Sequence, residues 1–372
     1  MEEIVNIPVG WNELKAGITR EDLRRAIAKS GYPLQASVAE VIRNTISSAG
    51  LDHAMFLQEE WAYIDGDSGE TRSIDIFADI SLSTEEQQLG ITLDLLVECK
   101  QSELPYVFFI RGKAPGLTGL FPEIVGLKSN YIEVYIKKDE RTAYGPVSMS
   151  IHDGLRFWSE QFFDAPVPYA ISLAKSVRKG KELELTGEEA YRSLTLPLLK
   201  AATYLRRSWA PVPESPSKGC VLVFSIAVLR APMYCLYRKG EKDVLDSLPW
   251  VRVCRLEPGK LGIGATSSES EVRFYDVVHE NYLEAYLDHL LKSSLVVSAK
   301  LQEAAQIIID GRAVHGPGDL FAEMVRPIPE SVHLPESDKK VPVTRFWRGM
   351  TSLRLEPASV TTISTLWKTG ET

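Results

Sequence analysis

Two short stretches carry residues whose types and spacing suit metal-ion chemistry. Residues 72–79 and 93–101 both alternate and are rich in aliphatic side chains, which predicts two strands. Asp75 lies in the first stretch, and Glu98 and Lys100 lie two residues apart in the second, so they share one face of their strand. If the strands are neighbours, two carboxylates and an ammonium meet in apolar surroundings. Burying such charge is costly unless it is paired, and a divalent cation would pair it.

The order of these residues resembles the PD-(D/E)XK nuclease superfamily. Its members carry an acid on one strand and an acid-any-lysine triplet on the next. Asp75 matches the first acid, and Glu98, Cys99 and Lys100 match the triplet. No proline precedes Asp75, which departs from the pattern in the family's name.

Two further residues resemble the Mrr-like and Holliday-junction-resolvase-like branches of that superfamily. These branches often carry a glutamate on the helix before the strands, and Glu40 fits that place. Gln101, directly after the lysine, also resembles them. The resemblance is good over residues 21–102 and looser up to about residue 286.

The resemblance implies a fold, a reaction and a cofactor. The fold is α/β, a restriction-endonuclease-like three-layer αβα sandwich with a mixed central sheet. The reaction is metal-dependent hydrolysis of phosphodiester bonds in DNA, in restriction, anti-phage defence or repair, and homodimers are common in this superfamily. The expected ligands of Mg²⁺ or Mn²⁺ are Asp75, Glu98, the Cys99 carbonyl and Glu40. Lys100 would stabilise charge developing on the phosphate, and Gln101 would steady the scissile phosphate.

Other interpretations of the same residues stay open. Lys100 paired with Glu98 or Asp75 would also form an ordinary salt-bridge cluster at a sheet edge. A nuclease-fold module that no longer cuts, and binds DNA or a partner protein instead, would keep the fold without the activity. A structural or assembly protein would use the acidic region only as solvated surface.

The charges are distributed unevenly along the chain. The net charge is −8, which by itself argues against a nucleic-acid partner. Residues 59–103 contain 12 acidic and 2 basic residues, whereas residues 175–207 contain 8 basic and 4 acidic residues. A helix expected over residues 188–209 carries Lys200, Arg206 and Arg207, which are candidates for phosphate contacts with DNA.

The order of apolar and turn-forming residues predicts a domain over 1–296 and a C-terminal extension over 297–372. A helical insertion is expected over about 148–218, including helices at 155–163 and 171–177. Residues 221–229 and 233–238 are expected to form a strand pair about Ala231 and Pro232. Further helices are expected over 281–291 and 297–309, and the tail beyond is a candidate contact for nucleic acid or a partner protein.

The spacing of the cysteines and the length of the apolar runs indicate the cellular compartment in which the protein is expected. Cys99, Cys220, Cys235 and Cys254 show no paired short spacing, so a zinc site is not expected and a reducing, cytoplasmic setting fits best. No apolar run reaches membrane-spanning length, and the start of the chain does not resemble a secretory signal.

Overall fold

The computed structural model describes residues 14, 16–51, 54–110, 121–160, 162–163, 169–211, 219–257, 271–316 and 324–334. The tail from residue 335 onward, expected to contact nucleic acid or a partner protein, lies outside these ranges. Within them, no helix is both long enough and apolar enough to cross a membrane.

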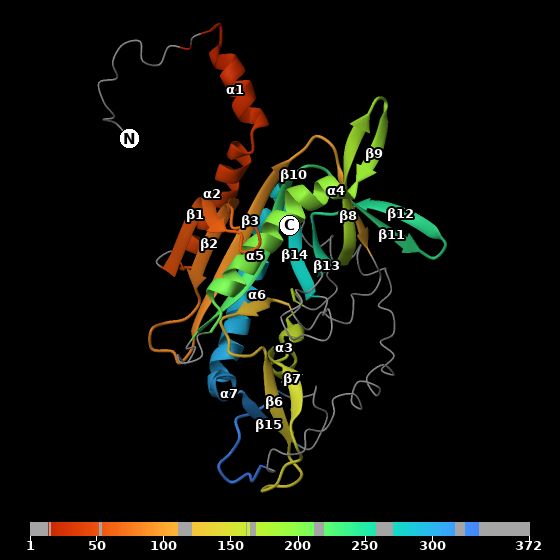
Figure 1. The fold of residues 1–372 in the computed structure, drawn as a ribbon. Coiled ribbons are helices and arrows are strands. Elements are labelled where there is room, and N and C mark those ends of the chain that lie inside the picture. Colours follow the sequence, from red (N-terminus) through yellow and green to blue (C-terminus); the bar gives the residue numbers. More distant parts are fainter. Residues whose placement is uncertain are drawn as a thin grey trace, which may run out of the picture.

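The described chain is built on a twelve-stranded mixed sheet (Figure 1). Its main path runs in the order β1 (Met55–Ile64), β2 (Thr71–Ser81), β3 (Gly90–Gln101), β10 (Gly219–Arg230), β14 (Glu271–His279), β13 (Trp250–Glu257), β8 (Tyr169–Lys179), β4 (Tyr106–Ile110), β11 (Met233–Lys239) and β12 (Lys242–Ser247). Off this path, β5 (Glu123–Val125) pairs with β10, and β9 (Glu182–Thr186) pairs with β8. A second sheet has the order β15 (Arg312–His315), β6 (Tyr131–Ile136) and β7 (Val147–Ser150).

The centre of the large sheet is parallel, and its first edge is antiparallel. β3, β10 and β14 run in the same direction, whereas β1, β2 and β3 form an antiparallel meander. The long aliphatic runs of β3 and β10 explain their central place, because strands of a parallel pair are covered on both faces.

Helices cover both faces of this sheet. α2 (Tyr32–Ser48) and α6 (Leu283–Glu303) pack in one core with Leu95 and Val97 of β3. α5 (Leu196–Ser208) packs in a second core with Leu96, which points to the opposite face. Figure 1 shows α5 lying along the sheet and α1 (Arg20–Lys29) projecting from the end of α2. The expected α/β class with a mixed sheet is confirmed.

A capping box fixes the start of α1. Thr19 is its N-cap, and its hydroxyl accepts a hydrogen bond from the Asp22 amide while the Asp22 carboxylate accepts from the Thr19 amide. This reciprocal capping satisfies amides that a helix leaves unpaired at its first turn.

The segment expected to be a helical insertion is only partly helical. The helix expected over 171–177 is wrong, because those residues form β8 and pair with β4 and β9. Residues 155–163 contain only a 3₁₀ turn (Phe157–Ser159), which follows the short α3 (Ile151–Gly154). The helix over 188–209 corresponds to α4 (Gly187–Ala190), a π-helical turn (Tyr191–Thr195) and α5.

Two other expectations about chain order differ from the structure. β10 and β11 do not pair with each other: β11 lies between β4 and β12, and the Pro232 carbonyl accepts a hydrogen bond from the Tyr106 amide. α6 follows a 3₁₀ turn (Glu280–Tyr282) and continues through residues 296 and 297, where a domain boundary was expected. Val297 and Leu301 are fully buried, and α7 (Ala305–Asp310) and β15 follow, so the chain beyond 297 contributes to the core.

Candidate active site

Asp75 and Glu98 come together where β2 and β3 leave their regular pairing. The last cross-strand pair is Ile76 with Val97, and beyond it the Cys99 amide donates a hydrogen bond of 2.6 Å to Asp75 Oδ2. On the other side of Asp75, Glu60 of β1 has a φ of 52°, a left-handed conformation that is uncommon for residues other than glycine. The regular pairing of β1 with β2 omits Glu60 and Asp75, so the ladder is interrupted beside Asp75.

Lys100 lies between the two carboxylates. Its Nζ forms an ion pair with Glu98 Oε1 and lies 3.9 Å from Asp75 Oδ2. The side chains of Asp75, Glu98 and Lys100 are 23%, 7% and 32% exposed, so the group opens to solvent mainly through the lysine and the aspartate. The three residues that the alternation of β2 and β3 predicted to meet thus lie at one place.

Burial makes this site electrostatically unusual. Burial, together with the charge of Asp75, raises the pKa of Glu98 to about 7 against the opposing effect of Lys100. Burial lowers the pKa of Lys100, but the charge and hydrogen bond of Glu98, together with the charge of Asp75, outweigh it, so the pKa stays above its usual value. Lys100 therefore remains an ammonium at neutral pH.

Glu40 is not placed with these residues. It is exposed on α2, away from the buried face of that helix formed by Leu34, Val38 and Ile42. The buried polar residue of α2 is Gln35, which the sequence analysis did not single out. Its position in the first turn of α2, on the apolar face of the helix, could have indicated from the sequence that Gln35 is buried.

Gln101 and the Cys99 thiol also face away from the carboxylates. Gln101 donates a hydrogen bond from its amide to the Ala28 carbonyl of α1, so it ties α1 to the end of β3. The Cys99 side chain is buried in the core with α2 and α6, and burial raises the pKa of its thiol. Only the backbone of Cys99 is available to the site.

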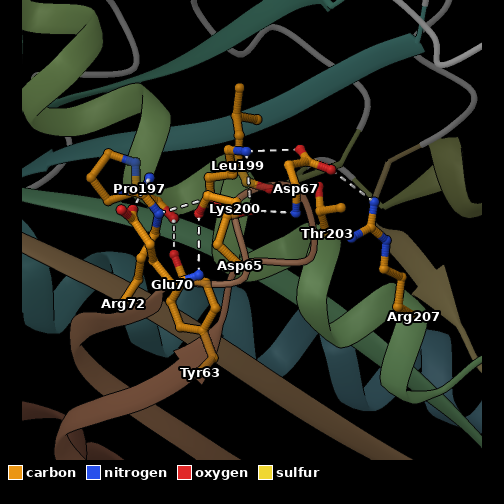
Figure 2. A network of polar contacts seen from close by, with 11 residues as sticks. Tyr63, Asp65, Asp67, Glu70, Arg72, Pro197, Leu199, Lys200, Thr203 and Arg207 are labelled. Carbon is orange, nitrogen blue, oxygen red and sulfur yellow. Dashed lines mark hydrogen bonds and ion pairs between the residues drawn. The ribbon is translucent and has the colours of Figure 1, made fainter.

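The basic residues of α5 are held by acidic residues of neighbouring elements. Lys200 Nζ lies 3.1 Å from Asp65 and 2.8 Å from Asp67, in the turn between β1 and β2. Arg207 contacts Asp67 at 3.2 Å, and Figure 2 shows how this network clamps the turn against α5. Arg206 donates to Glu123 of β5. Contacts of these three residues with DNA phosphates would have to compete with these ion pairs.

The donor atoms at the site suit a hard divalent cation. Asp75, Glu98 and the Cys99 carbonyl are oxygen donors, the kind that Mg²⁺ and Mn²⁺ prefer. Among the described residues, no cluster of three or more histidine, cysteine or acidic side chains could hold a metal ion, so a site here uses two carboxylates with the backbone. The buried Glu98 carboxylate, whose ion-pair partner is Lys100, fits such a group.

Comparisons with known proteins give no relative from which a function could be transferred to this site. No family model, curated protein or solved structure matches the chain. The arrangement of carboxylates and ammonium at the end of β3 is therefore the basis for any functional proposal.

A second carboxylate pair lies deeper on the same sheet face. Asp79 of β2 and Asp94 of β3 are cross-strand partners, and Asp94 is fully buried. Burial, together with the charge of Asp79, raises the pKa of Asp94 to about 8. The pair thus retains a proton near neutral pH, which sequence alternation alone did not reveal.

This pair predicts a pH dependence of stability. The pKa of Asp94 is higher in the folded state, about 8, than its ordinary value of 3.8, so the folded protein binds the extra proton and loses stability as the pH rises from about 4 to about 8. Asp94→Asn mimics the protonated form. We expect it to raise the free energy of unfolding at pH 8 by a few kcal/mol (order of magnitude), with a much smaller effect at pH 4.5.

Urea unfolding of the wild type and Asp94→Asn at both pH values checks this expectation. Asp288→Asn, on the exposed face of α6, is the matched control and should leave the pH dependence unchanged. Equal destabilisation by Asp94→Asn at both pH values would show that the pair does not share a proton.

Proposed function

We propose that this protein is a divalent-metal-dependent nuclease that hydrolyses phosphodiester bonds of DNA. The observation that carries the proposal is the meeting of Asp75 and Glu98 around the Lys100 ammonium, at the end of two adjacent strands. A mixed sheet with helices on both faces supports the restriction-endonuclease-like three-layer fold that would accompany this activity.

Each residue of the site would have a distinct role in the reaction. Asp75, Glu98 and the Cys99 carbonyl would hold Mg²⁺ or Mn²⁺, and the bound cation would supply Lewis-acid activation of water and neutralise phosphate charge. Lys100, which remains protonated, would donate hydrogen bonds to the phosphate oxygens as negative charge builds up on them. Asp75 is oriented for its part by the Cys99 amide.

The setting of the enzyme is part of the same proposal. Cys99, Cys220, Cys235 and Cys254 are all buried and unpaired in disulfides. Buried free thiols suit a reducing compartment, and we place the protein in the cytoplasm.

A cleavage assay tests the proposal. The wild type should cut linear, supercoiled or branched DNA in Mg²⁺ and stop in the presence of a chelator. Lys100→Ala should lose cleavage by a factor on the order of a hundred to a thousand, because a preorganised donor to the transition state is removed. Glu40→Ala should keep wild-type cleavage, because Glu40 is exposed on the outer side of α2.

Two outcomes would reject this assignment. Equal cleavage by the wild type and Lys100→Ala would place any nuclease activity elsewhere. DNA binding by the wild type, without cleavage in Mg²⁺ or Mn²⁺ on any of the three substrates, would favour an inactive nuclease-fold module that only binds DNA.

A further inference from the structure

Polar groups continue from Lys100 across the end of the sheet to β4 and β8. After β3 the chain crosses over the end of β10, where the Ser102 amide donates to the Arg230 carbonyl. It then enters β4 at Tyr106, whose ring is buried in the core beneath α5. Tyr106 is therefore held rigidly six positions after Lys100.

Lys175 of β8 is the cross-strand partner of Tyr106. Its side chain is only 21% exposed, and its Nζ forms an ion pair with Glu189 of α4, which is 44% exposed. The hydroxyl of Ser193, in the π-helical turn, donates to the Glu189 carbonyl and lies within hydrogen-bonding reach of the Tyr106 hydroxyl. The Lys175 ammonium, the second in this part of the sheet, is thus held in place by Glu189 on the strand next to Tyr106.

The Tyr106 hydroxyl lies under the influence of both lysines. Burial raises its pKa most strongly, while the positive charges of Lys175 and Lys100 oppose that effect. Lys100 and Lys175 are both partly open to solvent. Tyr106 follows Lys100 by six positions and is the cross-strand partner of Lys175, so it links the strand that carries one lysine to the strand that carries the other.

We propose that Lys175 binds a DNA phosphate close to the scissile phosphate. The proposal rests on the proposed nuclease function, since Lys100 would hold the phosphate that is cut. Consecutive phosphates of one strand need cations at consecutive places along their path, and lysine is well suited to bind phosphate as a point charge. In the free protein, Glu189 holds the Lys175 ammonium in position. A bound phosphate would have to compete with Glu189 for this ammonium.

A purely structural role for this ion pair makes opposite predictions. If Lys175 and Glu189 only anchor α4 to β8, removing either charge would lower stability and leave DNA affinity unchanged. If Lys175 binds phosphate, removing its charge weakens DNA binding, whereas removing the charge of Glu189 strengthens it.

The test is DNA binding by the full chain, measured without cleavage in a chelator. A fluorescent duplex is titrated at several salt concentrations with the wild type, Lys175→Ala, Lys175→Arg and Glu189→Gln. We expect Lys175→Ala to bind roughly tenfold more weakly and to lower the slope of log affinity against log salt by about 0.9. Glu189→Gln should bind more tightly, and Lys175→Arg should keep the wild-type slope because its charge remains.

Lys292→Ala is the matched control. Lys292 forms an exposed ion pair with Asp288 on α6 and should leave both affinity and slope unchanged. Wild-type affinity and slope in Lys175→Ala, or weaker binding by Glu189→Gln, would overturn the proposal. If Lys175→Ala does not fold, Glu189→Gln decides the question: tighter binding supports the proposal, and unchanged or weaker binding overturns it.

The outcomes separate this proposal from the nuclease function on which it rests. No binding to DNA by the wild type at low salt would reject the nuclease function and the subsite with it. Normal wild-type binding and cleavage, with unchanged binding in Lys175→Ala, would reject the subsite alone.

Discussion

Glu98→Gln is expected to abolish metal-dependent DNA cleavage while the protein remains folded. The amide keeps the shape of the side chain but cannot supply the ionised oxygens that a hard cation requires. We expect kcat to fall by on the order of a thousandfold or more. The free energy of unfolding should change by less than about 1 kcal/mol, because Lys100 is partly exposed and keeps Asp75 within 3.9 Å.

Steady-state cleavage kinetics and urea unfolding of the same preparations provide the two readouts. Glu103→Gln is the matched control, since Glu103 is an exposed acid shortly after the end of β3, and it should cut at the wild-type rate. Wild-type cleavage by Glu98→Gln would contradict the assignment. An unfolding loss of about 3–5 kcal/mol would instead identify Glu98 as one half of a structural buried pair.

Asp276→Ala is expected to cause the largest loss of stability. Asp276 of β14 accepts two hydrogen bonds of 2.8 Å from Arg252 of β13 and one of 2.7 Å from the Tyr286 hydroxyl of α6. Arg252 and Asp276 are 0% and 1% exposed, and the guanidinium lies 3.7 Å from the centre of the Phe121 ring. Removing the carboxylate leaves a buried cation without its counter-charge, which costs about 3–5 kcal/mol.

Two comparisons make this prediction specific. Asp288→Ala breaks the exposed pair with Lys292 and should cost less than about 1 kcal/mol. The double variant Arg252→Met with Asp276→Leu removes both buried charges and should recover most of the lost stability. Chemical unfolding of all three measures the differences, and a loss below about 1 kcal/mol for Asp276→Ala would show that the pair is not what joins β13, β14 and α6.

The site was predictable where local periodicity was enough. The alternation of β2 and β3 placed Glu98 and Lys100 on one face and predicted that Asp75 would be near them, as the ion pairs of Lys100 show. The apolar run of residues 221–229 predicted a strand, and the structure places this strand, β10, at the centre of the sheet, where both of its faces are buried.

The parts that depend on distant partners were not predictable. Residues 171–177 have a composition compatible with a helix, but pairing with β4 and β9 makes them a strand. Lys200 and Arg207 were expected to face DNA, whereas the turn between β1 and β2 brings Asp65 and Asp67 to them from more than a hundred residues away. Glu40 could be assigned to a helix, but the side of α2 that faces the sheet depends on packing with β3 and α6.

Diffraction from crystals soaked in Mn²⁺, measured for its anomalous signal, tests the central claim most directly. We expect a manganese ion held by Asp75, Glu98 and the Cys99 carbonyl in the wild type, and no ion there in Glu98→Gln. A Mn²⁺-saturated crystal with no ion at that place, and with Lys100 still paired to Glu98, would contradict it.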